Sequence, residues 1–153
     1  MEHVEYAYTR GMDDAEIEER LRTAGTGVLA LSGDGEAYAI PLAHYYDGEG
    51  LYFRLGTTDG DRKREFWERT ETACYVLYGA EPTEDPRGLD SWSVLVTGRL
   101  VELPEADRER FDTAEINRRF SPIRVFDEDV EEIEITIAEL EMETVTGRST
   151  PVQ

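Results

Sequence analysis

Three short segments with alternating apolar residues follow one another in the first half of the chain, and only tight turns separate them. Residues 33–35 (Gly-Asp-Gly) form the first turn and residues 47–50 (Asp-Gly-Glu-Gly) the second. Turns this short join antiparallel strands, whereas parallel strands need crossovers of roughly a dozen residues or more. The sequence therefore predicts an antiparallel meander over 28–31, 36–46 and 51–55. It argues against a dinucleotide-binding α/β fold, and no G-x-G-x-x-G motif is present.

Alternation within these strands assigns their side chains to faces, because successive residues of a strand point to opposite sides. One face of the second strand carries Tyr38, Ile40, Leu42 and His44. In the third strand, the inward residues are Leu51, Phe53 and Leu55, and the opposite face carries Tyr52 and Arg54.

The rest of the chain continues the pattern of short strands and adds helices. Three further strands are expected, over residues 72–78, 91–103 and 133–147. Three helices are expected, over residues 13–24, 61–69 and 105–120, and residues 79–90 read as a surface loop. No linker divides the chain, so we expect one domain over 1–153 with a loose N-terminal arm over 1–12. The predicted fold is mainly β with flanking helices, a small antiparallel barrel.

Charge limits the partners that such a barrel can have. The formal net charge is −19, and the basic residues are fifteen arginines and a single lysine, Lys63. A strongly negative field repels nucleic acid and anionic membranes, so neither is an expected partner. Dense carboxylates are tolerated where concentrated salt shortens the screening length to about 3 Å at 1 M. With no apolar run long enough to span a bilayer and no secretory signal, the composition predicts a halophilic, cytoplasmic protein.

The segment over residues 51–64 is the most informative for chemistry. A strand carries Arg54 to a loop of glycine and threonine, and a helix then begins with Arg62, Lys63 and Arg64. Helix N-termini favour acidic residues, so three basic residues there oppose the helix dipole unless an anion is bound between them. The alternative is that these residues pair with acids such as Glu65 on a solvated face. The two readings are nearly balanced, and the single lysine retained in a composition that otherwise avoids lysine slightly favours the anion site.

This order of features resembles the pyridoxamine 5′-phosphate oxidase-like flavin-binding proteins. The resemblance rests on Tyr52-Phe53-Arg54, the glycine loop and Arg62-Lys63 at a helix start, and extends over about residues 27–103. It implies a six-stranded split β-barrel, a homodimer, and flavin mononucleotide (FMN) bound near the subunit interface.

The resemblance also implies a set of cofactor-binding residues. Arg62 and Lys63 take the position of the basic pair that binds the phosphate, and Arg54 reaches the phosphate or the ribityl chain. The backbone of residues 40–42 would lie along the isoalloxazine edge, and the second subunit would contribute from the start of the fifth strand. The predicted cofactor site comprises Ile40, Pro41, Leu42, Phe53, Arg54, Thr57, Arg62, Lys63, Trp92 and Ser93.

The sequence departs from the true oxidases in a longer loop before Arg62 and in lacking their substrate-binding tail, which argues against pyridoxamine phosphate as substrate. We therefore expect a flavin-dependent oxidoreductase that acts on a small molecule or an electron carrier. The alternatives are a non-catalytic protein that binds flavin, deazaflavin or haem, and a barrel with a vacant pocket that serves as an interaction protein. No catalytic residue and no metal site is predicted.

Expectations also follow for His44, for Cys74 and for an acidic stretch. His44 is expected to be partly buried with one hydrogen bond, or else to donate a proton near the flavin or ligate a haem. Cys74 lies in a predicted strand and is expected to be a small buried apolar residue. The acidic residues over 127–132 lack the spacing of a calcium loop and are expected to form a solvated face.

Overall fold

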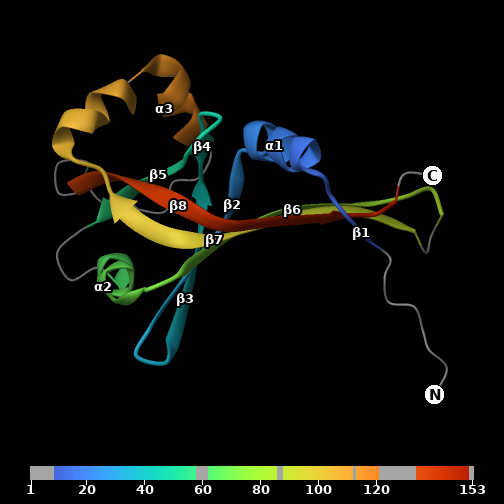
Figure 1. Ribbon diagram of the computed structural model, residues 1–153, viewed down its shortest axis with the longest axis horizontal. Helices are drawn as coiled ribbons and strands as arrows, with labels where there is room; N and C mark the ends of the chain where they lie inside the picture. Colours follow the sequence, from blue (N-terminus) through green and yellow to red (C-terminus); the bar gives the residue numbers. More distant parts are fainter. Residues whose placement is uncertain (1–8, 58–61, 86–87, 112, 121–133, 152–153) are drawn as a thin grey trace.

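The computed structural model describes residues 9–57, 62–85, 88–111, 113–120 and 134–151. Its strands form one antiparallel sheet in the order β3-β2-β6-β7-β8-β5-β4, and β1 pairs with β8 (Figure 1). The six longer strands are β2 (Thr26–Gly33), β3 (Glu36–Ala43), β5 (Leu51–Thr57), β6 (Ala73–Pro82), β7 (Leu89–Glu102) and β8 (Glu134–Ser149). The two short strands are β1 (Arg10–Gly11) and β4 (Tyr45–Tyr46).

The sheet curls into a barrel that is split along one side. β3 and β4 lie at opposite ends of the strand order, yet only His44 separates them in the chain, so the two ends of the sheet must meet. β4 covers only the start of β5, since it pairs Tyr45 with Tyr52 and Tyr46 with Leu51. The rest of β5 and the outer edge of β3 therefore form the split. The prediction of a mainly β, antiparallel split barrel is confirmed.

Tight turns set the register of the first hairpin. Asp34 and Gly35 both have positive φ angles, 52° and 79°, which is the conformation of the two-residue turn that matches strand twist. The turn pairs Gly33 with Glu36 and continues to Thr26 opposite Ala43. In this register alternate residues point inward, and Ile40 and Leu42 are buried while Pro41 is exposed.

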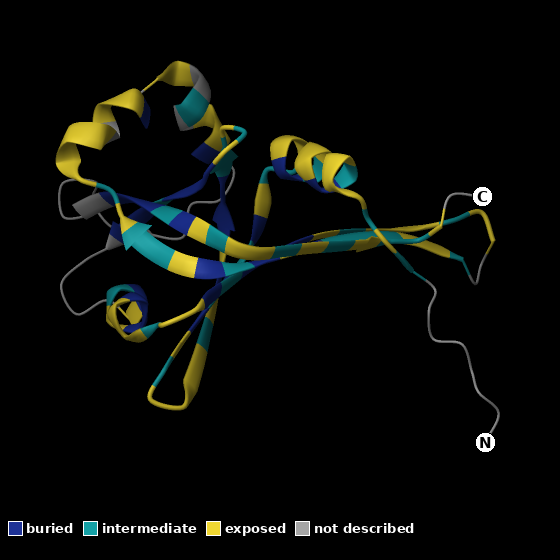
Figure 2. Ribbon diagram, viewed as in Figure 1, coloured by how far each residue is buried: buried dark blue, intermediate teal, exposed yellow. Residues whose placement is uncertain are grey.

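Two groups of apolar residues stabilise the barrel. The main core fills the interior with strand residues such as Phe53 and Tyr75, whose rings meet edge to face at 4.7 Å, and the buried residues concentrate in the barrel (Figure 2). Two helices close this core: α1 (Asp14–Thr23) with Ile17 and Leu21, and α2 (Arg62–Arg69) with Phe66 and Trp67. The second group lies outside β5, where the 3-10 helix η1 (Glu105–Phe111) and α3 (Ala114–Phe120) cover Tyr52 and Ile137.

The first helix begins as predicted. Asp13 caps α1 through a bond from the Glu16 backbone N–H, at 2.8 Å, to its carboxylate.

The structure corrects the sequence reading in three places. The loop expected over 79–90 is short, because β6 and β7 extend through it as a ribbon that reaches past the barrel (Figure 1). The helix expected over 105–120 is divided, and Thr113 caps its second part by accepting from the Ile116 N–H at 3.2 Å. The expected loose arm ends before residue 10, where β1 pairs with Arg148 and Ser149. Residues 1–8 and 127–132 lie outside the described residues.

Of the helices that the structure describes, none is long and apolar enough to cross a bilayer.

Candidate functional site

The start of α2 lies beside the end of β5, at one end of the split. Lys63 is only 9% exposed, and its ammonium donates to the Gly56 carbonyl at 2.5 Å. Arg62 is exposed, and its guanidinium lies 3.8 Å from the Glu36 carboxylate at the first residue of β3. The predicted basic pair therefore lies between the two strand edges that bound the split.

Arg64 adds a third positive charge on the same turn. It ion-pairs with Glu68 at 3.3 Å and with Glu102 at 3.7 Å. Its Nη1 is buried and has no hydrogen-bond partner in the part of the chain that the structure describes. A buried charged donor of this kind requires an acceptor, which is water, a bound anion or a group outside the described residues.

The edge of β3 offers backbone groups to the split. His44 N–H donates to the Gly25 carbonyl at 3.2 Å, which continues the β2–β3 ladder. In this ladder the backbone N–H and C=O groups of Leu42 bond to β2. The backbone groups of Ala39, Pro41 and Ala43 point the other way, toward the split. Proline is tolerated at an edge position of this kind because its missing N–H removes no ladder bond.

The edge of β5 faces the same gap. The Gly56 carbonyl accepts from Lys63 and so points away from β8. By alternation, the backbone groups of Arg54 point the same way. A flat molecule with polar edges, placed in the split, would meet carbonyl and N–H groups on both sides.

Several predicted residues can contribute through their backbone only. The side chains of Ile40, Leu42 and Phe53 are all buried in the core. Thr57 is the last residue of β5, and its side chain lies outside the described residues.

Arg54 lies on the outer face of β5. Its guanidinium is 4.9 Å from the centre of the Phe120 ring in α3. Its charge therefore lies on the helix-covered side of β5, while Lys63 reaches the strand edge.

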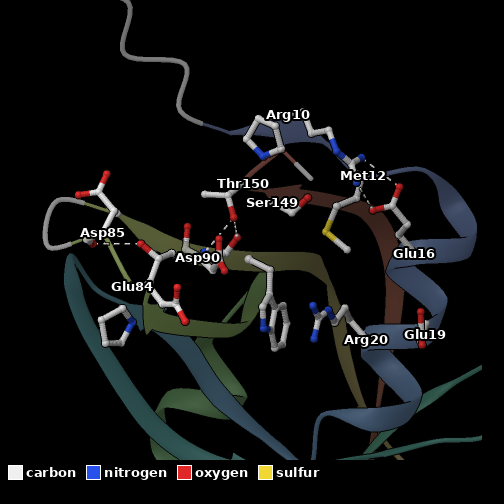
Figure 3. A pocket seen from close by; sticks show the side chains of 16 residues that line it. Arg10, Met12, Glu16, Glu19, Arg20, Glu84, Asp85, Asp90, Ser149 and Thr150 are labelled. Carbon is white, nitrogen blue, oxygen red and sulfur yellow. Dashed lines mark hydrogen bonds and ion pairs between the residues drawn. The ribbon is translucent and has the colours of Figure 1, made fainter. Parts of the chain in front are cut away.

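Trp92 and Ser93 are not brought near this site within one chain. Trp92 pairs with Ser149 at one end of β8, and Arg54 pairs with Ile137 near the other. These positions are twelve residues apart along β8, which corresponds to about 40 Å of strand. Trp92 instead stacks under the Arg20 guanidinium, at 4.3 Å, beside a hollow of about 1230 Å³ between α1 and the ribbon (Figure 3). In Figure 3 Arg20 reaches from the helix, and Glu84 and Asp85 lie at the tip of the ribbon.

His44 lies inside the molecule, between α1 and the sheet. It is 2% exposed, and its two ring nitrogens lie 2.8 Å from the Tyr75 hydroxyl and 3.0 Å from the Leu21 carbonyl. Burial lowers the pKa of His44, and the nearby charge of Arg119 lowers it further. Because both nitrogens are engaged, His44 cannot ligate a haem without breaking these bonds. The Tyr75 partnership had no signal in the sequence, since the two residues are 31 positions apart.

Cys74 differs from its expected role. It is only partly buried, on the outer face of β6, while its neighbours Ala73 and Tyr75 point into the core. Burial raises the pKa of its thiol.

Comparison with known proteins identifies the family. The profile of the pyridoxamine 5′-phosphate oxidase family matches residues 13–149. The match covers most of the chain, and the chain belongs to this family. No curated protein matches it in sequence.

The fold is shared with solved structures. A protein from Bacteroides thetaiotaomicron assigned to 5-nitroimidazole antibiotic resistance superposes with a TM-score of 0.70 at 18% identity, over 92% of this chain and 87% of that one. An FAD-binding protein from Mesorhizobium loti superposes with a TM-score of 0.68 at 21% identity, over 94% of this chain and 99% of that one. The FAD and heme binding protein from Mycobacterium smegmatis superposes with a TM-score of 0.68 at 16% identity, over 95% of this chain and 74% of that one. At these identities the likeness establishes the fold.

Proposed function

We propose that the chain binds a flavin in the split between β3 and β5 and uses it as an oxidoreductase. The observation that carries the proposal is Lys63, the single lysine of the chain, which is buried at the start of α2 beside the open edge of β5. A buried ammonium next to a helix N-terminus is a natural site for a phosphate. The unpartnered Nη1 of Arg64 and the polar edge of β3 also fit a phosphorylated, flat cofactor.

Each proposed contact follows from one of these positions. Lys63 and Arg62 would bind the phosphate. Arg54 would meet the ribityl chain through its backbone groups at the edge of β5, because its guanidinium lies on the helix-covered face. The strand edge at residues 39–43 would orient the ring through backbone groups and exclude water from one side of it. When bound, a flavin supplies electron or hydride transfer to a small molecule or another electron carrier.

FMN is the form we propose, and FAD is the second candidate. The Mesorhizobium loti and Mycobacterium smegmatis structures of the same fold are named FAD-binding, although they share at most 21% identity with this chain. FAD carries a second phosphate and an adenosine, so it needs room beyond the basic pair.

A second copy of the chain is the proposed partner. The outer sheet face consists of side chains that point away from the core in rows across β3, β2, β6, β7 and β8. These residues are Pro41, Val28, Val76, Leu95 and Thr146 in one row, Ala39, Ala30, Cys74, Thr97 and Thr144 in the next, and Tyr78, Ser93 and Arg148 in a third.

The composition of the outer sheet face favours an interface between copies. The chain has 35 acidic residues, but none of them lies in these three rows; the exposed Glu141 and Glu143 follow further along β8. Tyr78 and Leu95 are 67% and 43% exposed on it. Two copies that each carry a charge of −19 would meet least repulsion through a face of this kind. Ser93 lies on the outer sheet face, so the approach would also bring the start of β7 close to the partner.

The test is an absorption spectrum of protein purified in molar salt, before and after FMN or FAD is added. A flavin spectrum that stays with the protein through gel filtration supports the proposal, and the preferred nucleotide identifies the form. A protein that retains neither FMN nor FAD contradicts it, and deazaflavin and haem would then be tested. Reduction of the bound flavin by a nicotinamide nucleotide, with turnover, distinguishes an enzyme from a carrier.

A further inference from the structure

A buried chain of hydrogen bonds links α1 to β3. The Leu21 carbonyl at the end of α1 lies 3.0 Å from His44 Nε2, and His44 Nδ1 lies 2.8 Å from the Tyr75 hydroxyl. That hydroxyl in turn lies 3.0 Å from the Leu42 carbonyl of β3. His44 is 2% exposed and Tyr75 is fully buried, so water does not compete for these bonds.

The number of hydrogens in this chain depends on the charge of His44. Both ends are carbonyls and can only accept, so the three contacts need three hydrogens. Neutral His44 and Tyr75 together supply two, whereas protonated His44 and Tyr75 supply three. With neutral His44 one of the three contacts lacks its hydrogen. In the Nε2–H tautomer, His44 donates to Leu21, and the Tyr75 hydroxyl donates either to Nδ1 or to Leu42, but not to both. In the Nδ1–H tautomer, His44 donates to Tyr75, the hydroxyl donates to Leu42, and Leu21 loses its bond. With protonated His44, Nδ1–H donates to Tyr75, and the hydroxyl is free to donate to Leu42.

The surroundings of His44 allow it to exchange a proton with solvent. A hollow of about 220 Å³ borders the ring and is lined in part by Arg22, Asp47 and Arg119. The charged groups that face it are therefore Arg22 from α1, Asp47 from the turn after β4, and Arg119 from α3. The titratable side chains nearby are Tyr45 and Tyr46 of β4. Burial and Arg119 keep His44 neutral near pH 7.

A change in the hydrogen bonding of the Leu42 carbonyl would affect the β3 edge that borders the split. It lies between Pro41 and Ala43, whose outward backbone groups form the β3 edge described above. Among the strands that the structure describes, β3 pairs with β2 alone, so one side of β3 has no ladder of hydrogen bonds to hold it. The hydroxyl of Tyr75 also lies under the Gly27–Leu42 rung, where a Cβ added to Gly27 would come within 2.8 Å of it.

We propose that His44 and Tyr75 are positioning residues for the flavin site, and that Tyr75 passes the protonation state of His44 to the Leu42 carbonyl of β3. This inference rests on the proposed flavin function. With His44 protonated, the completed chain anchors β3 from the core, and an anchored edge binds a flat ligand with less loss of freedom. Flavin binding therefore tightens as the pH falls through the His44 transition. By linkage, bound flavin raises the affinity of His44 for its proton by the same factor.

The test compares wild type with Tyr75→Phe, which keeps the ring against Phe53 and removes only the hydroxyl. The FMN dissociation constant is measured in molar salt from about pH 8 down through the His44 transition, which lies below the ordinary histidine pKa because burial lowers it and which ring ¹⁵N shifts locate. The phosphate of FMN also titrates near pH 6, but it does so equally in both proteins and cancels in the ratio of their dissociation constants. Tyr46→Phe, which removes a hydroxyl bonded to the Gly48 carbonyl, is the matched control.

We expect the ratio of the FMN dissociation constant of Tyr75→Phe to that of wild type to grow about fivefold as the pH falls, because one buried hydrogen bond contributes about that much. Tyr46→Phe should follow wild type. Ring ¹⁵N shifts should show a higher His44 pKa with FMN bound than without. A ratio that stays constant with pH, or a His44 pKa that FMN does not move, overturns the inference and leaves the flavin site standing. Wild type that binds neither FMN nor FAD at any pH overturns the proposed function and this role with it.

Discussion

At the scale of single residues, the structure shows how much depends on close contacts that composition does not reveal. Lys63 is the single lysine of the chain, and the structure buries its ammonium against a backbone carbonyl instead of leaving it on a solvated face. Gly27 leaves room for the Tyr75 ring to pass beneath the β2–β3 rung. His44 accepts burial because both its nitrogens have partners. The contacts of these residues can be tested by substitution.

Gly27→Ala should destabilise the fold. An added Cβ would lie 2.5 Å from the Val76 carbonyl and 2.6 Å from Cζ of Tyr75, which is closer than real contacts allow. Overpacking of this kind costs about 1–3 kcal/mol. The control is Gly11→Ala, whose Cβ would meet nothing within 4 Å. Urea unfolding in molar salt measures the difference, and equal midpoints for the two variants would contradict the packing described here.

His44→Gln should flatten part of the pH dependence of stability. The folded state holds His44 neutral because burial lowers its pKa from 6.5, while the unfolded chain takes up a proton at that value. Wild type should therefore lose free energy of unfolding as the pH falls below 6.5, by up to about 1.4 kcal/mol per unit for one group. The variant has no histidine at this position and does not lose stability in this way. The carboxylates titrate alike in both proteins, so their effect cancels in the difference between the two free energies of unfolding. Parallel curves of stability against pH would show that His44 titrates alike in both states.

At the scale of elements, alternation and turn chemistry predicted most of the strands. The glycine turns at 33–35 and 47–50 fixed the antiparallel hairpins, and basic residues at 62–64 marked the start of α2 as the candidate site. The ribbon over 79–90 was missed because its prolines and acids are typical of a loop. It also extends beyond the core, and alternation of apolar and polar residues marks only strands that pack against a core. The distance between Trp92 and Lys63 and the exposure of the outer sheet face depend on how strands pair far apart in sequence, which local patterns do not encode.

Leu95→Glu should separate the proposed dimer. Leu95 is 43% exposed in one chain, so the carboxylate is tolerated by the fold but would be buried twice across a two-fold interface. We expect the apparent mass to fall to that of a monomer in light scattering. Ala114→Glu, at the exposed first residue of α3, adds the same charge away from the outer sheet face and should not change the mass. A wild-type protein that is already monomeric in molar salt would rule the interface out.

At the scale of the whole molecule, the charge of −19 opposes the compact fold of the split barrel. The barrel needs a compact sheet, whereas so many carboxylates repel one another when the chain folds. The described ion pairs, such as Arg69–Asp34 at 3.0 Å, are exposed and offset only part of this repulsion. The basic residues at the start of α2 therefore stand out as a positive site on a negative molecule.

Salt should stabilise the fold strongly. Raising KCl from about 0.1 M to about 1 M shortens the screening length from about 10 Å to about 3 Å and weakens the repulsion between surface carboxylates. We expect the midpoint of thermal unfolding to rise steadily over this range. Sorbitol at matched osmolality is the control for general solvent effects. A midpoint that does not move with salt would contradict the prediction of a halophilic protein.

The most direct test of the central claim pairs one change in the protein with one change in the ligand. FMN and riboflavin differ by the phosphate alone, and Lys63→Met removes the charge while it keeps the buried stem. We predict that wild type prefers FMN over riboflavin and that this preference falls at least about tenfold in Lys63→Met, because a charge-assisted contact is lost. Arg69→Ala, at the other end of α2, removes the same charge and should keep the wild-type preference. An FMN-to-riboflavin preference that is equal in wild type and Lys63→Met would contradict the placement of the phosphate at this site.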